Sequence, residues 1–104
     1  MNDRELLEAA AKAAEIPLDS DGDRTDIREN GGMPKRWNPL TNDGDALRLA
    51  VKLELDICHT PHEPPKVAVW VDADHDFIEE DRGTDHCAAW RRAIVRAAAA
   101  MVKP

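Results

Sequence analysis

Residues 37–55 read WNPLTNDGDALRLAVKLEL, and the rest of the chain is organised around this stretch. Thr41 offers a hydroxyl that can cap a helix, and Asp43 places negative charge at the positive end of the helix dipole. Apolar residues then recur at helical spacing. We therefore predict a helix over 43–52 with one buried and one solvated face. The buried face carries Ala46, Leu49, Ala50 and Leu53, and the solvated face carries Asp45, Arg48 and Lys52.

The residues before this stretch predict one helix and one loop. Asn2 followed by Glu5 is a capping signal, and the helical spacing of the apolar residues that follow predicts a helix over Asp3–Glu15, which Pro17 ends. Residues 18–36 show no sustained period and are rich in Asp, Gly and Arg. We predict a long, exposed acidic loop there.

The residues after it predict a small sheet and a closing helix. Residues 53–57 alternate apolar and acidic side chains, and 66–72 read KVAVWVD, which predicts two strands; 77–80 suit a short third one. The strand over 66–72 is apolar on both faces, so we expect helices on both faces of the sheet. A last helix capped by Thr84 would bury Trp90, Ala93, Ile94, Ala97 and Met101. The predicted class is α+β: a two- to three-stranded antiparallel sheet within an α-β-α sandwich of three helices.

Size and composition fit one small domain. The 104 residues are 42% hydrophobic and 34% charged, which is typical of a globular protein that does not cross a membrane. The N-terminal MNDRELLE carries charges where a signal peptide needs apolar residues, so we expect a cytoplasmic protein with two free thiols.

Charge is unevenly distributed. The chain has a net charge of −7, yet residues 1–85 hold all 21 acids and only 10 bases, and the last helix is basic. This imbalance argues against direct nucleic-acid binding. It leaves open an acidic surface that mimics a nucleic acid, and a homodimer in which the basic helix meets an acidic face.

The cysteines and histidines lie close together in the sequence. Residues 58–87 hold Cys58, His59, His62, His75, His86 and Cys87. These are ligand types that zinc takes, but their spacings match no zinc framework, so a metal site is the weaker alternative and we assign no metal residues. No catalytic triad or phosphate-binding loop is present, so we expect no enzyme and no cofactor.

The central stretch also resembles a known family. The resemblance is carried by Trp37, Pro39, Thr41, Asp43, Ala46, Leu49, Lys52 and Leu53, by the Trp-bearing strand, and by Arg92 and Ala93 of the last helix. This pattern resembles the phage alpha-beta-alpha sandwich domain family of small phage and prophage proteins. The first 36 residues depart from it, because the family's Met-Gly-Trp segment is absent. The resemblance implies helices on both sides of a sheet and carries over no site residue.

These observations lead to one functional hypothesis and its alternatives. We expect a non-enzymatic phage or prophage accessory protein that binds another protein, from the host or the phage, in the bacterial cytoplasm. The alternatives are an acidic nucleic-acid mimic that inhibits a host defence complex, and a metal-binding protein. Long loops often carry function, so the expected interaction surface combines the loop with the exposed side of the central helix. It comprises Asp19, Asp21, Asp23, Asp26, Trp37, Asp45 and Arg48.

Overall fold

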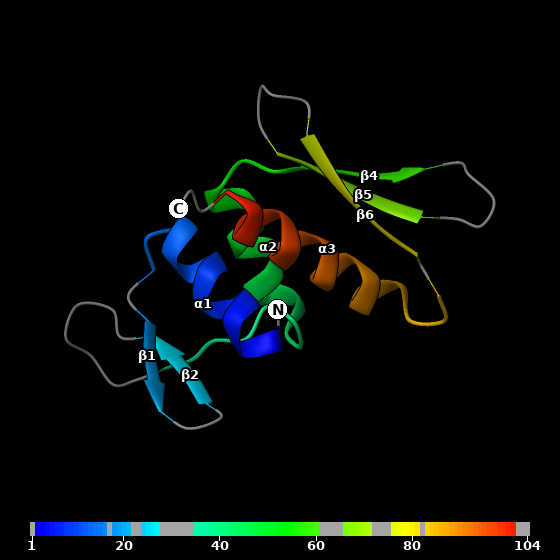
Figure 1. Cartoon of the computed structure of the whole chain (residues 1–104). Helices are drawn as coiled ribbons and strands as arrows, with labels where there is room; N and C mark the ends of the chain where they lie inside the picture. Colours follow the sequence, from blue (N-terminus) through cyan, green and yellow to red (C-terminus); the bar gives the residue numbers. More distant parts are fainter. Residues whose placement is uncertain are drawn as a thin grey trace.

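The chain forms three helices and two small antiparallel sheets (Figure 1). The computed structural model describes residues 2–16, 18–21, 24–27, 35–60, 66–71, 76–81 and 83–101. The elements in chain order are α1 (Asp3–Ala13), β1 (Leu18–Asp21), β2 (Arg24–Ile27), β3 (Lys35–Arg36), α2 (Asp43–Lys52), β4 (Asp56–Thr60), β5 (Lys66–Val71), β6 (Asp76–Asp81) and α3 (His86–Ala100).

The larger sheet has the order β4-β5-β6, with both strand pairs antiparallel. In this register Val69 lies between Ile57 and Ile78, and Ala68 lies between Cys58 and Glu79. Partners opposite each other share a face, so the first three side chains lie on one face and the second three on the other. The predicted α+β class, with three helices and a three-stranded antiparallel sheet, is confirmed.

The three helices lie on one side of this sheet (Figure 1). Helix α3 packs against β5 and β6, and α1 and α2 pack against α3. We expected helices on both faces, because Ala68 and Trp70 make the second face of β5 apolar. Ala68 is nevertheless only 2% exposed. Its small side chain lies between Cys58 and Glu79 in the register.

Residues 18–36 correct the sequence prediction. We expected one long loop, but β1, β2 and β3 form a second antiparallel sheet, with Leu18 opposite Ile27 and Asp26 opposite Arg36. Only Gly22 and Asp23 separate β1 from β2, and glycine beside aspartate is a hairpin-turn signal. The high content of Asp and Arg in residues 18–36 favoured an exposed loop over this hairpin in the sequence prediction.

The core sits between the three helices and the larger sheet. Alanines dominate where α1 meets α3, and small side chains let the two helices approach closely. The larger buried side chains include Leu49 of α2, Val67 and Val69 of β5, and Val95 of α3. Each such side chain contributes about 1.5–3 kcal/mol through burial.

The helix ends follow from local chemistry. Asn2 caps α1 as predicted, by accepting a hydrogen bond from the Glu5 amide at 2.8 Å. The predicted caps Thr41 and Thr84 are wrong by one residue. The side chains of Asn42 and Asp85 cap α2 and α3 instead, because each reaches the amide three residues ahead.

Two helices end in the same way. Helices α1 and α2 are each followed by a glutamate at positive φ, Glu15 at 55° and Glu54 at 53°. In both cases the next residue donates its amide to the carbonyl five residues earlier, Ile16 to Ala11 and Leu55 to Ala50, each at 2.9 Å. This is the Schellman motif. Helix α1 therefore ends at Ala13, two residues before the predicted end, and β4 begins only at Asp56.

Candidate functional site

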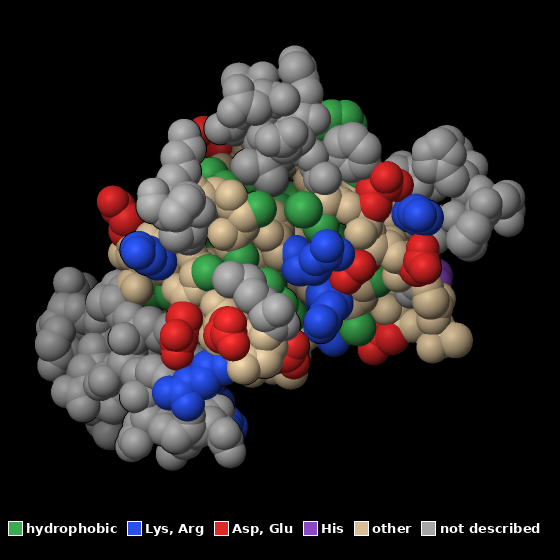
Figure 2. All heavy atoms as spheres, viewed as in Figure 1, with side chains coloured by type: hydrophobic (Ala, Val, Ile, Leu, Met, Phe, Trp, Pro, Cys, Tyr) green, Lys and Arg blue, Asp and Glu red, His purple; other side chains and the backbone are tan. Residues whose placement is uncertain are grey.

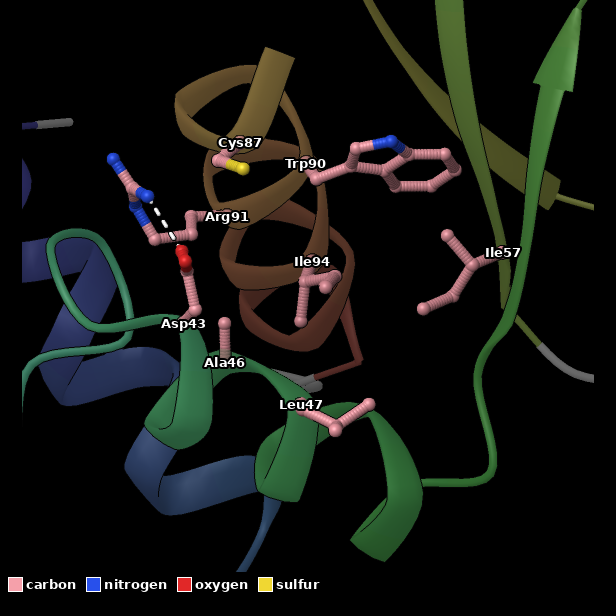
Figure 3. Close-up of a pocket in the computed structure, with 8 residues that line it drawn as sticks. All are labelled: Asp43, Ala46, Leu47, Ile57, Cys87, Trp90, Arg91 and Ile94. Carbon is pink, nitrogen blue, oxygen red and sulfur yellow. Dashed lines mark hydrogen bonds and ion pairs between the residues drawn. The ribbon is translucent and has the colours of Figure 1, made fainter. Parts of the chain in front are cut away.

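An open groove of about 390 Å³ lies between α2, α3 and β4 (Figure 3). Its walls are mainly apolar, with one polar end. It is lined by Asp43, Ala46 and Leu47 of α2, Ile57 of β4, and Cys87, Trp90, Arg91 and Ile94 of α3.

The groove exists because α3 lies off the centre of the sheet. Helix α3 packs against β5 and β6, and β4 is the outer strand on the other side of β5. Val69 of β5 is fully buried, whereas its neighbour Ile57 on the same face is 39% exposed. The Ile57 side chain points toward Trp90 and Ile94 across the groove (Figure 3). The helix-facing side of β4 is therefore only partly covered.

Helix α2 adds a second apolar wall. Its buried face uses Ala46, Leu49 and Ala50, as predicted. Leu47 and Val51 lie outside this face and are 59% and 68% exposed. They are four residues apart, so they are neighbours on the helix surface. Together with Ile57 they are the exposed large hydrophobic residues in the described part of the chain, and Leu47 and Ile57 both line the groove.

The polar end of the groove is a fixed ion pair. The Arg91 guanidinium donates to Oδ1 of Asp43 at 2.6 Å and to the Leu40 carbonyl oxygen at 2.8 Å. The Arg91 side chain is only 17% exposed. These contacts join α3 to the start of α2 and set the separation of the two helices. Arg91 and Asp43 thus form an ion pair with each other. The apolar walls are the part of the groove that remains accessible to a ligand.

The residues of the predicted interaction surface come from different elements of the structure. Asp19, Asp21 and Asp26 lie in β1 and β2, where Asp19 and Asp26 are opposite partners, and Asp23 lies outside the described residues. Trp37 was expected on this surface but is 4% exposed and belongs to the core, since an indole buries a large apolar area.

Asp45 is a second correction. It was expected on the wet face of α2 but is 6% exposed. Its Oδ2 accepts the backbone N–H of Asn38 at 3.0 Å, and its Oδ1 accepts from Nη2 of Arg48 at 2.8 Å. A structural role for the carboxylate explains its burial, because it satisfies a loop amide. Arg48 is exposed, as predicted, and its side chain keeps 66% of its accessible area.

The two cysteines lie on different surfaces. Both are free, as predicted, and both are exposed. Cys87 lines the groove, whereas Cys58 shares the opposite face of the sheet with Ala68. Among the residues that the structure describes, no three His, Cys, Asp or Glu side chains are placed to hold a metal ion. His62 and His75 lie outside that set.

The arginines of α3 are paired with acids of the same chain. Arg92 lies 3.6 Å from Asp3 and 3.4 Å from Glu80, and Arg96 lies 2.9 Å from Glu80. On the face seen in Figure 2, basic and acidic side chains lie side by side. The basic helix that stood out in the sequence is therefore largely neutralised locally.

Sequence reasoning missed the groove. Trp90 and Ile94 were assigned to the core stripe of the last helix, and Ile57 to a strand. The available signal was the pair Leu47 and Val51, two large apolar residues on a helix whose buried face was already complete without them. Such a pair indicates a second apolar surface.

Comparison of the chain with protein-family models, with curated proteins and with solved structures finds no match. Within the described residues, no helix combines the length and the apolar character needed to cross a membrane.

Proposed function

We propose that this chain is a non-enzymatic protein-binding module that takes its partner in the groove between α2, α3 and β4. The observation that carries the proposal is the exposure of Leu47 and Ile57 on two walls of one groove. Contiguous apolar surface with a polar margin is typical of protein interaction sites. The half-buried Trp90 between these walls is the kind of side chain that anchors such interfaces.

The polar groups of the groove support binding more than chemistry. Asp43 and Arg91 are engaged with each other, and Cys87 is the thiol among the described residues that line the groove. A nucleophilic mechanism would require a base beside that thiol and donors for an oxyanion. Among the residues that the structure describes, none of those lining the groove is a histidine.

The resemblance to the phage alpha-beta-alpha sandwich domain family supplies the biological setting of the proposal. The partner would then be a host or phage protein in the bacterial cytoplasm. Arg92 and Arg96 pair with Glu80 of the same chain. This supports a protein partner over a nucleic acid, because a surface that binds nucleic acid needs cations that can contact phosphates.

A capture experiment with matched variants tests this proposal. The wild-type chain, Leu47→Gln and Lys12→Gln are each immobilised and exposed to a lysate of bacterial cells, and the retained proteins are quantified by mass spectrometry. Leu47 and Lys12 are both exposed helix residues, so the two variants should fold alike. We expect a protein that wild type and Lys12→Gln retain and that Leu47→Gln loses at least about tenfold, since anchors at an interface centre contribute about 1–2 kcal/mol or more.

Alkylation of Cys87 provides an independent test. In a Cys58→Ser background, N-ethylmaleimide adds bulk only within the groove, and capture of the same protein should fall. The control is the variant lacking both thiols, treated in the same way. Retention of an identical set of proteins by wild type, Leu47→Gln and the alkylated chain would show that the groove is not the binding surface.

A further inference from the structure

We infer that the partner enters the groove as an extended segment, which adds to the outer edge of β4 and alternates apolar residues with basic ones. This inference rests on the proposed function and specifies the conformation and chemistry of the partner.

The first support is the edge of the sheet. Strand β4 pairs with β5 and has no partner on its other side among the residues that the structure describes. An edge strand presents unpaired N–H and C=O groups to any chain that approaches. Strand β6 forms the other edge, but it carries Glu79, Glu80 and Asp81, and charged residues are a common protection of edges. The middle of β4 has Ile57 and Cys58 and carries no such charges.

The second support is the position of the groove relative to that edge. The groove lies beside α3 on the β4 side of the sheet, with Ile57 as the contribution of β4 (Figure 3). In a strand added to β4, the residue opposite Ile57 would point to the same face. That side chain would enter the groove between Leu47 and Trp90. One added strand would therefore pair with the N–H and C=O groups at the edge of β4, and it would also cover the apolar walls of the groove. A helix in the groove would cover the walls but leave the β4 edge groups unpaired.

The third support is charge. Asp56 begins β4 and, by strand alternation with Ile57, lies on the face away from the groove. A basic side chain opposite Asp56 would gain a cross-strand pair of opposite charge. The whole chain carries −7, so its long-range field attracts a cationic segment and repels a second copy of itself. The occupant is thus a segment of another protein, apolar toward the groove and basic toward solvent.

A designed peptide tests this inference directly. The probe is the acetylated and amidated peptide Lys-Val-Lys-Val-Lys-Val-Lys, labelled for fluorescence anisotropy, with the Glu-for-Lys peptide as its charge control. We expect the lysine peptide to bind at least about tenfold more tightly than the glutamate peptide, and to bind more weakly as salt is added. Leu47→Gln should weaken binding about tenfold and Lys12→Gln should not.

Two N-methylated versions of the probe identify strand addition. Along a strand, alternate residues point their N–H groups to opposite sides. Methylation of the three valine amides and methylation of the inner lysine amides therefore remove donors on opposite sides of the peptide. We expect one series to lose binding about tenfold or more and the other to keep it. Bound peptide should also slow amide exchange in β4 and leave β6 unchanged.

Several results would overturn the inference. Loss of binding in both methylated series indicates a helical ligand, and loss in neither indicates nonspecific attraction. Absence of binding at about 1 mM peptide, or protection of β6 in place of β4, also contradicts it. A chain that dimerises through β4 on its own would assign the edge to a second copy. If Leu47→Gln still loses its captured protein while any of these results holds, the proposed function stands and only the extended-segment inference fails.

Discussion

Removal of the Asp45 carboxylate tests the most specific structural contact that the sequence did not predict. In Asp45→Ala the backbone N–H of Asn38, held at 3.0 Å by Oδ2, loses its acceptor. Asp45 is 6% exposed, so water replaces the carboxylate poorly. Hydrogen bonds to a charged group contribute about 1.5–3 kcal/mol. The lost charge at the start of α2 costs about 0.3–1 kcal/mol more.

Two smaller effects also contribute to the change in the free energy of unfolding. The pair with Arg48 adds at most about 1 kcal/mol, because the Arg48 side chain is 66% exposed. Alanine is the better helix former by about 0.5 kcal/mol, which offsets part of the loss. The expected decrease in the free energy of unfolding is about 2–3 kcal/mol. Asp45→Asn keeps an oxygen acceptor and should lose about half as much.

Urea unfolding followed by tryptophan fluorescence measures this decrease. With a slope of about 1–1.5 kcal/mol/M, the midpoint of Asp45→Ala should fall by about 2 M and the slope should not change. Arg48→Ala is the matched control, since it breaks the same ion pair but leaves Asn38 its acceptor, and it should cost less than about 1 kcal/mol. If Asp45→Ala is no more costly than Arg48→Ala, the loop amide does not depend on Asp45 and the explanation for its burial is wrong.

Three further substitutions probe the core, a helix end and the polar end of the groove. Leu49→Ala should destabilise by about 3 kcal/mol because Leu49 is 1% exposed, while Leu47→Ala in the same helix should stay within about 0.5 kcal/mol; equal midpoints in urea would contradict the burial pattern. Glu54→Gly should stabilise by about 0.5–1 kcal/mol, since glycine adopts the φ of 53° without strain, and a thermal midpoint at or below that of wild type would exclude this. Arg91→Gln should cost about 1–2 kcal/mol through loss of its contact to the Leu40 carbonyl, and more than Asp43→Asn, whose carboxylate is 69% exposed; the reverse order in chemical unfolding would refute this reasoning.

The helices could be predicted because their signals are local. Helix α2 runs over Asp43–Lys52 as the spacing predicted, and Asn2 caps α1. The caps Asn42 and Asp85 were missed by one residue, because each stands beside a threonine that is almost equally suited to the position. Sequence preference alone does not separate such neighbours. The competition is decided by which side chain meets the free amide three residues ahead.

The alternation after α2 was misread because two structures share it. The alternation of Leu53, Leu55 and Ile57 with acids predicts a strand. In the structure Leu53 ends the helix, Glu54 adopts positive φ, and Leu55 is buried as the apolar residue that follows a Schellman motif. Only Ile57 belongs to the strand. A helix end with a Schellman motif and a half-buried strand both bury every second residue, so the two structures share one sequence pattern.

The groove could not be predicted because it depends on an offset between elements. The apolar character of Trp90 and Ile57 is visible in the sequence, which predicts Trp90 in the buried stripe of the last helix and Ile57 in a strand. Whether such residues are covered depends on where α3 lies under the sheet. It lies under β5 and β6, so Ile57 remains partly exposed. Hydrophobic spacing records that a face is apolar, but it does not record how many strands one helix covers.

Helix α2 carries two separate apolar surfaces. Its buried face, which includes Leu49, holds it against the rest of the domain, and that contact does not require Leu47 or Val51. Single exposed apolar residues are ordinary on protein surfaces. These two are neighbours on one turn, and Leu47 faces Ile57 across a groove beside an unpaired strand edge of the described sheet. Stability alone does not account for that arrangement, because polar side chains at the same exposed positions would fold as well. An extended partner segment would account for the apolar walls and the open edge together.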